Sequence, residues 1–226
     1  METILDTGER RALEESKCEK DLGVMIANDL KWGTQVQGMV AKANRALGIL
    51  KRTFTSRDSN LWKTLYTSLV RPHLEYASSV WNSLLQQEID ELERVQRRAT
   101  KIPENAYKKV YDSRLKEWGL TSLEVRRKRG DLIQIYKSIN GIEKINWHTG
   151  PTFSQYDRSR AAKTNEKRLV RETFPASQQN SFCHFTNVRH DFFLNRVSVE
   201  WNKLSNTQIN AICVNSFKAM IDKTGS

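Results

Sequence analysis

The apolar residues of this chain recur every three to four positions over most of its length, which is the period of an amphipathic α-helix. The first such stripe predicts a helix from Thr34 to about Arg52, with Thr34 and Gln37 at the spacing of a capping box. A second helix is expected after Asp58, ended or kinked at Pro72. The core-facing residues are predicted to be Val36, Met39, Val40, Ala43, Leu47 and Leu50 on the first helix and Leu61, Leu65 and Leu69 on the second.

Four more helical segments are expected before residue 141. A short, largely buried segment covers residues 74–81, and a longer helix covers residues 86–102. A short helix should end before Gly119, and the next should begin with a capping box formed by Thr121 and Glu124 and end near Asn140. Their predicted core residues are Ile89, Leu92, Val95, Ala99 and Ile102, then Val110, Leu115 and Trp118, then Val125, Leu132, Tyr136 and Ile139.

The two ends of the chain have different patterns. Residues 21–26 resemble a short strand or hairpin edge, and without a larger sheet this element is expected to dock loosely. Residues 143–180 are polar and show little periodicity, which predicts a long loop or linker. A final pair of helices is expected around Trp201 and Phe217, the second capped by Asn215 or Ser216.

These elements predict a mainly α-helical protein with four regions. They are a strand remnant over residues 1–33, a helical bundle over residues 34–142, a polar loop or linker over residues 143–180, and a small helical module over residues 181–226. Apolar residues make up 38% of the chain, and its six Trp argue for a folded protein. Trp62, Tyr66, Tyr76 and Trp81 are therefore expected in the core rather than stacked on nucleic-acid bases.

Several classes of protein are disfavoured by composition. No apolar run approaches the roughly 20 residues that span a bilayer, and the first residues lack the pattern of a signal peptide. The three widely scattered Cys are typical of reduced thiols rather than of a disulfide framework. The expectation is a protein that is not bound to membranes and that resides in the cytoplasm or the nucleus.

The charge of the chain is strongly and locally basic. Its 37 basic and 26 acidic residues give a formal net charge of +11, which favours a polyanionic partner. Residues 94–129 alone carry 12 basic and 4 acidic residues. The candidate nucleic-acid-binding residues are Lys42, Arg45, Lys51, Arg52, Arg97, Arg98, Lys101, Arg126, Arg127, Lys128 and Arg129.

Two explanations of these basic residues remain open. They can be solvated helix faces, and cations in a last helical turn also offset the helix dipole, as at residues 97–101. The dipole does not explain residues 126–129, because they lie near the start of a predicted helix, where it disfavours cations. Arg126 and Arg127 are expected to point away from the core, so this second cluster favours an external anion.

Catalytic motifs are absent from the sequence. It contains no pair of adjacent Asp residues to hold catalytic metal ions, and the acids of residues 88–93 are explained by the dipole at the start of a helix. It also has no HExxH, no paired CxxC and no glycine-rich phosphate loop. These 226 residues are therefore expected to form no enzyme by themselves, with no catalytic residue, metal or cofactor.

Several blocks of sequence resemble one family. They are LYTSLVRPHLEYASSVW from Leu65, ELERVQRRATK from Glu91, GLTSLEVRRKRGDLIQIYKSING from Gly119, and LNRVSVEWNKL with the later NSFK. In this order they resemble the C-terminal part of the reverse transcriptases of non-LTR retrotransposons, most closely the jockey-like and chicken-repeat-like clades. The segment EKDLGVMIANDLKW from Glu19 resembles the strand of that family's primer-grip region.

The resemblance implies a thumb-like helical bundle that holds template and primer by the backbone. It also implies that the polymerase active site, a Tyr-x-Asp-Asp hairpin with a further Asp, belongs to a segment upstream of Met1. The expected function is therefore that of a truncated reverse-transcriptase-like protein that binds RNA or DNA without sequence preference. The alternative is a helical interaction protein, derived from a mobile element, that binds an acidic protein partner.

Overall fold

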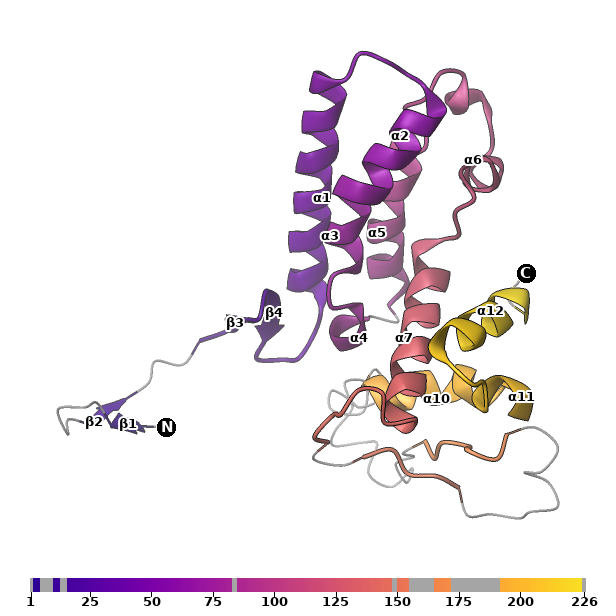
Figure 1. Ribbon diagram of the computed structural model, residues 1–226. Coiled ribbons are helices and arrows are strands. Elements are labelled where there is room, and N and C mark those ends of the chain that lie inside the picture. The colour runs from indigo at the N-terminus through magenta and orange to yellow at the C-terminus, as the bar shows by residue number, and fades with distance from the viewer. Residues whose placement is uncertain are drawn as a thin grey trace.

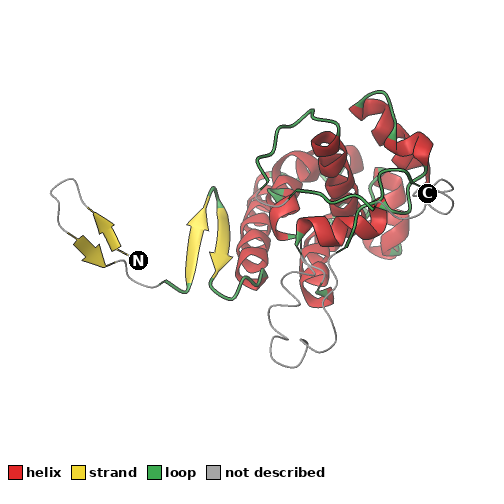
Figure 2. Cartoon of the chain, turned by 90° about the horizontal axis from the view of Figure 1, so that it is seen from below, coloured by secondary structure: helices red, strands yellow, loops and turns green. Residues whose placement is uncertain are grey.

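The computed structural model describes residues 2–4, 10–12, 16–82, 85–147, 150–154, 165–171 and 192–224. Over these residues the protein is mainly helical, with short antiparallel strand pairs near the N-terminus (Figures 1 and 2), so the predicted fold class is confirmed. Two hydrophobic cores organise the helices, one between α1 and the first turn of α7 and the other around the C-terminal helices.

Two hairpins precede the helices. Strands β1 (Glu2–Ile4) and β2 (Arg10–Ala12) form the first, and β3 (Cys18–Asp21) and β4 (Val24–Ala27) form the second. In the second hairpin Asp21 pairs with Val24, so the loop has only two residues. Both have positive φ, 44° at Leu22 and 87° at Gly23, which is the backbone of a primed turn that matches the twist of the strands.

The second hairpin is docked on the helices, which corrects the expectation of an unpaired strand. Val24 is buried in the first core, and the Met25 amide donates a hydrogen bond to Oε1 of Gln35 at 2.9 Å. The hydroxyl of Tyr76 donates to the carbonyl oxygen of Leu22 at 2.8 Å. Tyr76 itself is half exposed, whereas the other three aromatic residues predicted in the core, Trp62, Tyr66 and Trp81, are buried.

Helix α1 (Gly33–Thr53) follows the predicted pattern. Val36, Met39, Ala43, Leu47 and Leu50 are buried, and Val40 packs against them. The predicted capping box is wrong, because the helix begins at Gly33 and its N-cap, Trp32, makes no side-chain hydrogen bond.

The second helical segment continues through a π-helical turn. Asp58 caps α2 (Ser59–Leu65), which runs into η1 (Tyr66–Val70) and then α3 (Arg71–Glu75). The amide of Arg71 donates to the carbonyl of Tyr66, so the wide turn precedes Pro72 and the helix continues to Glu75.

The π turn also changes which residues of this segment are buried. Trp62, Tyr66, Val70 and Leu74, spaced by four, form the buried stripe. The wider turn keeps residues four apart on one face. The predicted face of Leu61, Leu65 and Leu69 is therefore wrong in part. Leu65 is partly buried and packs against the first core, whereas Leu69 is 50% exposed.

The next elements complete the first core. They are α4 (Ser78–Trp81), α5 (Gln86–Ala99), the single turn η2 (Ala106–Lys108) and α6 (Tyr111–Trp118), which ends at Gly119 with φ of 60°, as predicted. Gln96 on α5 is buried, accepts from the Tyr66 hydroxyl at 2.7 Å and donates to Oε1 of Glu93 at 3.0 Å. Glu93 Oε2 accepts from the Leu123 amide at 2.9 Å, so buried polar bonds fix α5 against its neighbours.

Helix α7 (Leu123–Ile139) joins the two cores. Leu123 packs in the first core, whereas Ile135 and Tyr136 pack in the second. The two cores therefore meet within this helix. Its N-cap is Ser122, whose hydroxyl accepts from the Val125 amide at 3.3 Å, one residue after the predicted Thr121.

The second core is formed by α10 (Phe193–Trp201), α11 (Asn206–Ile209) and α12 (Val214–Thr224) with the end of α7. The periodicity does not predict helix α11, although Ser205 and Gln208 form a capping box. Helix α12 begins before the predicted caps, since the Phe217 amide donates to the Cys213 carbonyl at 3.0 Å.

The described part of residues 143–180 is not a free linker. Leu169 is buried in the second core, Asn165 donates to the carbonyl of Trp201 at 2.8 Å, and Phe153 forms a β-bridge with Leu169. These stretches contain no helix, as expected, but they cover the C-terminal helices. The basic residues Arg158, Arg160 and Lys163 lie outside the described residues.

Candidate nucleic-acid interface

A groove of about 360 Å³ runs between α1 and α5, and it gathers three of the predicted binding residues. Lys51 lies on the α1 side, and Arg98 and Lys101 lie at the end of α5. The remaining lining residues are Asn44, Leu47, Gly48 and Ile102.

Helical geometry explains why these residues share the groove. Asn44, Leu47, Gly48 and Lys51 are three or four residues apart on α1 and therefore form one face. Arg98 has the same spacing to Lys101, just beyond the end of α5. Helices α1 and α5 run in the same direction, so their C-terminal ends lie side by side at one end of the bundle (Figure 1).

The groove combines a cationic rim with an uncharged floor. Leu47 is buried and Ile102 packs against the first core, while Lys51, Arg98 and Lys101 are exposed. A Cβ atom added to Gly48 would meet no atom within 4 Å, so this glycine leaves the floor open. The site can therefore accept an anionic chain whose charges meet the rim.

No internal carboxylate neutralises this rim within the part of the chain that the structure describes. Lys51, Arg98 and Lys101 make no ion pair there. The negative ends of the α1 and α5 dipoles attract the same cations, which accounts for part of their placement. Three unpaired cations around one groove nevertheless leave a local positive field available to a ligand.

The remaining predicted cations of α1 and α5 do not line the groove. Lys42, Arg45 and Arg52 are exposed on α1. Arg97 is exposed as well, and its guanidinium lies 4.7 Å from the centre of the Tyr111 ring, at cation–π distance. The outward placement predicted for the basic face of α5 is confirmed.

The second basic cluster, on α7, has partners within the protein. Arg126 forms a bidentate ion pair with Glu75, and this hydrogen bonding raises its pKa. Lys128 pairs with Glu124 at 2.7 Å, and Arg129 pairs with Asp222 at 2.6 Å. The dipole argument therefore does not require an external anion at Arg126, Lys128 and Arg129, because internal acids pair with these three cations.

The structure corrects the predicted position of Arg127. The sequence pattern predicts that it points away from the core, but it is 2% exposed. Its Nε donates to Asn82 Oδ1 at 2.9 Å, and its guanidinium lies 5.9 Å from the Trp81 ring centre. Burial lowers the pKa of Arg127. A signal was present in the sequence, since Leu123, Arg127, Asp131 and Ile135 are spaced by four and all are buried.

No family model, curated protein or solved structure matches this chain. Among the described residues, no group of three or more His, Cys, Asp or Glu is arranged to hold a metal ion. None of the helices described is both long and apolar enough to cross a membrane.

Proposed function

We propose that this chain binds the sugar–phosphate backbone of RNA or DNA, without sequence preference, through the groove between α1 and α5. The observation that carries the proposal is the convergence of Lys51, Arg98 and Lys101 on one groove with no carboxylate partner among the described residues. Lysine and arginine on a rim suit phosphate contacts, which position a nucleic acid but carry no sequence information.

The sequence resemblance supports the wider context of the proposal. A chain similar to the thumb and tail of a non-LTR retrotransposon reverse transcriptase would use this helical region to hold a template–primer duplex. In this proposal the polymerase chemistry lies outside these residues, so the purified chain does not extend a primer on an RNA template with Mg²⁺ or Mn²⁺.

The decisive experiment is a titration of a labelled duplex at several salt concentrations. The variant Lys51→Ala/Arg98→Ala/Lys101→Ala should bind more weakly and should flatten the slope of log K against log salt by about 2 to 3, since each phosphate contact contributes about 0.9. The control is Lys116→Ala/Lys144→Ala/Lys223→Ala, which removes the same charge from exposed residues outside the groove.

Equal losses in the two triple variants would mean that net charge, not the groove, drives binding, and the proposal would fail. The same reactions with polyglutamate as competitor test the alternative function. If polyglutamate or an acidic protein binds tightly and the duplex does not bind at moderate salt, the interaction-protein hypothesis replaces the nucleic-acid one.

A further inference from the structure

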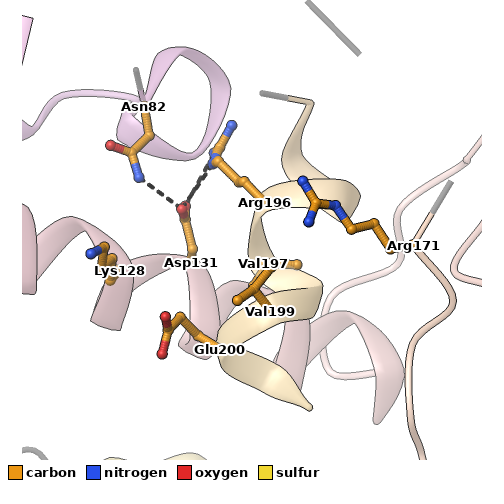
Figure 3. Close-up of a pocket in the computed structure, with 8 residues that line it drawn as sticks. All are labelled: Asn82, Lys128, Asp131, Arg171, Arg196, Val197, Val199 and Glu200. Atoms are coloured by element: carbon orange, nitrogen blue, oxygen red, sulfur yellow. Dashed lines mark hydrogen bonds and ion pairs between the residues drawn. The ribbon is translucent and has the colours of Figure 1, made fainter. Parts of the chain in front are cut away.

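A second pocket lies at the junction of the two cores, away from the basic groove. It has a volume of about 180 Å³ and is bounded by Asn82 at the end of α4, by α7, by α10 and by Arg171 (Figure 3). An engineered cavity of about 150 Å³ holds benzene, so this pocket has room for a ligand of that size.

The buried carboxylate in the wall of this pocket already accepts three hydrogen bonds. Asp131 Oδ2 accepts from Asn82 Nδ2 at 2.9 Å and from Arg196 Nε at 3.0 Å. Its Oδ1 accepts from the Arg196 guanidinium at 3.2 Å. Figure 3 shows these side chains converging on Asp131. A cation entering the pocket would have to displace these bonds.

The N–H donors of Arg171 are available to a ligand in this pocket. The side chain of Arg171 makes no ion pair or hydrogen bond with the described residues, and it lines the pocket with all its N–H donors available. Glu200, the other acid in the wall, pairs with Lys203 at 2.9 Å.

Arg127 adds further positive charge beside this wall. Its described hydrogen bond is to the neutral amide of Asn82, which itself lines the pocket, and its NH1 atom is buried without a partner. The positive charges of Arg127 and Arg171 are therefore not cancelled by a hydrogen-bonded carboxylate among the described residues. Nearby carboxylates, Asp131 among them, nevertheless attract the Arg127 charge and act to raise its pKa, so the positive charge left for an anion at this pocket is that of Arg171.

Helix α10 contributes two apolar residues to the pocket, beside its charged residues Arg196 and Glu200. Val197 is 2% exposed, and Val199 lies further along α10. We infer that this pocket binds a small organic anion, with a carboxylate or phosphate group on Arg171 and a short aliphatic stem against Val197 and Val199. Both oxyanions match the planar fork of a guanidinium, which can donate two parallel hydrogen bonds to either one.

This inference does not rest on nucleic-acid binding, because none of the residues of the pocket lines the α1–α5 groove. The test uses isobutyrate and isobutyl phosphate as probes, with isobutyramide as an uncharged match in shape, in calorimetric titrations of the full chain. At least one of the two anions should bind saturably and should raise the melting temperature with concentration, whereas the amide should not. The tighter of the two anions identifies which oxyanion the pocket takes.

The variant Arg171→Gln should weaken binding of that anion by roughly 10- to 100-fold, the loss expected for a hydrogen bond to a charged group. Its unfolding should match that of the wild type, because the side chain has no partner among the described residues. Arg168→Gln is the matched control, since Arg168 is exposed on the same segment and does not line the pocket.

Two results would overturn the inference. One is the absence of saturable binding by both anions, or binding of isobutyramide as tight as that of isobutyrate. The other is equal affinity of wild type and Arg171→Gln, which would place any bound anion elsewhere.

Discussion

Nε of Arg127 donates a hydrogen bond to Oδ1 of Asn82 at 2.9 Å, inside the protein and between helices that lie far apart in the sequence. The same Asn82 donates through Nδ2 to Asp131, which also binds Arg196 on α10. Asn82 thus joins the end of α4 to α7 through both of its amide atoms, and Asp131 extends the connection to α10. Because these bonds are buried, we expect their loss to lower the stability of the fold.

We expect Arg127→Ala to destabilise the fold by about 1–3 kcal/mol, because it leaves the buried Asn82 oxygen unpaired and empties space beside Trp81. Urea denaturation followed by tryptophan fluorescence measures the change. Lys128→Ala removes a half-exposed neighbour with a local i,i+4 partner and should cost less than about 1 kcal/mol. Equal effects of the two variants would contradict the buried role of Arg127.

Replacing two glycines with alanine should change the stability of the protein in opposite directions. Gly48→Ala should stabilise the protein by roughly 0.5–1 kcal/mol, because the glycine is in a helix interior with open space around its Cβ position. Gly119→Ala should do the opposite, since Gly119 has φ of 60°. Thermal denaturation of both variants checks the two signs.

A larger side chain at Gly48 should interfere with ligand binding. Gly48→Glu places a carboxylate between Lys51 and the cations of α5 and should weaken duplex binding. Gly38→Glu is its matched control, because Gly38 lies on the same helix with equally open space and does not line the groove. If both variants reduce duplex affinity to the same extent in the salt titration, the groove is not the binding site.

Stability should decline in acid partly through two surface carboxylates. Hydrogen bonding from Arg129 lowers the pKa of Asp222, and hydrogen bonding from Lys137 and Gln134 lowers that of Glu143. A lowered folded-state pKa means that the stabilisation is complete above the unfolded-state values, about 3.9 for Asp and 4.3 for Glu, and is lost as the pH falls through the folded-state values.

Exposed pairs of this kind contribute roughly 0.2–1 kcal/mol each. Asp222→Asn should therefore lower the free energy of unfolding slightly at pH 7 and should give a shallower decline below about pH 4. Urea titrations at a series of pH values make the comparison. An unchanged decline in the variant would show that the Arg129 pair does not contribute to acid unfolding.

The second hairpin should owe part of its protection to Gln35. Gln35→Met removes the acceptor of the Met25 amide and should accelerate hydrogen exchange at that amide by roughly two- to tenfold, the effect of a typical hydrogen bond. Gln37→Met, at an exposed position of the same helix, is the control. Unchanged exchange at Met25 in Gln35→Met would mean that β3 pairing alone protects β4.

The sequence by itself determined most of the longer helices and the outward direction of the α1 and α5 cations. A period of 3.6 is a local property, so the buried stripe from Val36 to Leu50 and that from Ile89 to Ala99 could be predicted without knowing what covers them. The end of α6 at Gly119 could be predicted for the same reason. The positive φ that follows a helix is a property of the local backbone, and glycine adopts it most easily.

Tertiary structure decided which charges remain available to a ligand. Glu75 is 51 residues from Arg126, and Asp222 is 93 residues from Arg129, so no local pattern links these ion pairs. The π turn before Pro72, which moves the buried stripe onto Tyr66 and Val70, depends on packing in the same way. The sequence does not show whether a charged residue forms an ion pair with a distant acid. Such pairs depend on how the helices pack. Only packing left Lys51, Arg98 and Lys101 without partners among the described residues and paired Arg126 and Arg129 of α7 with distant acids.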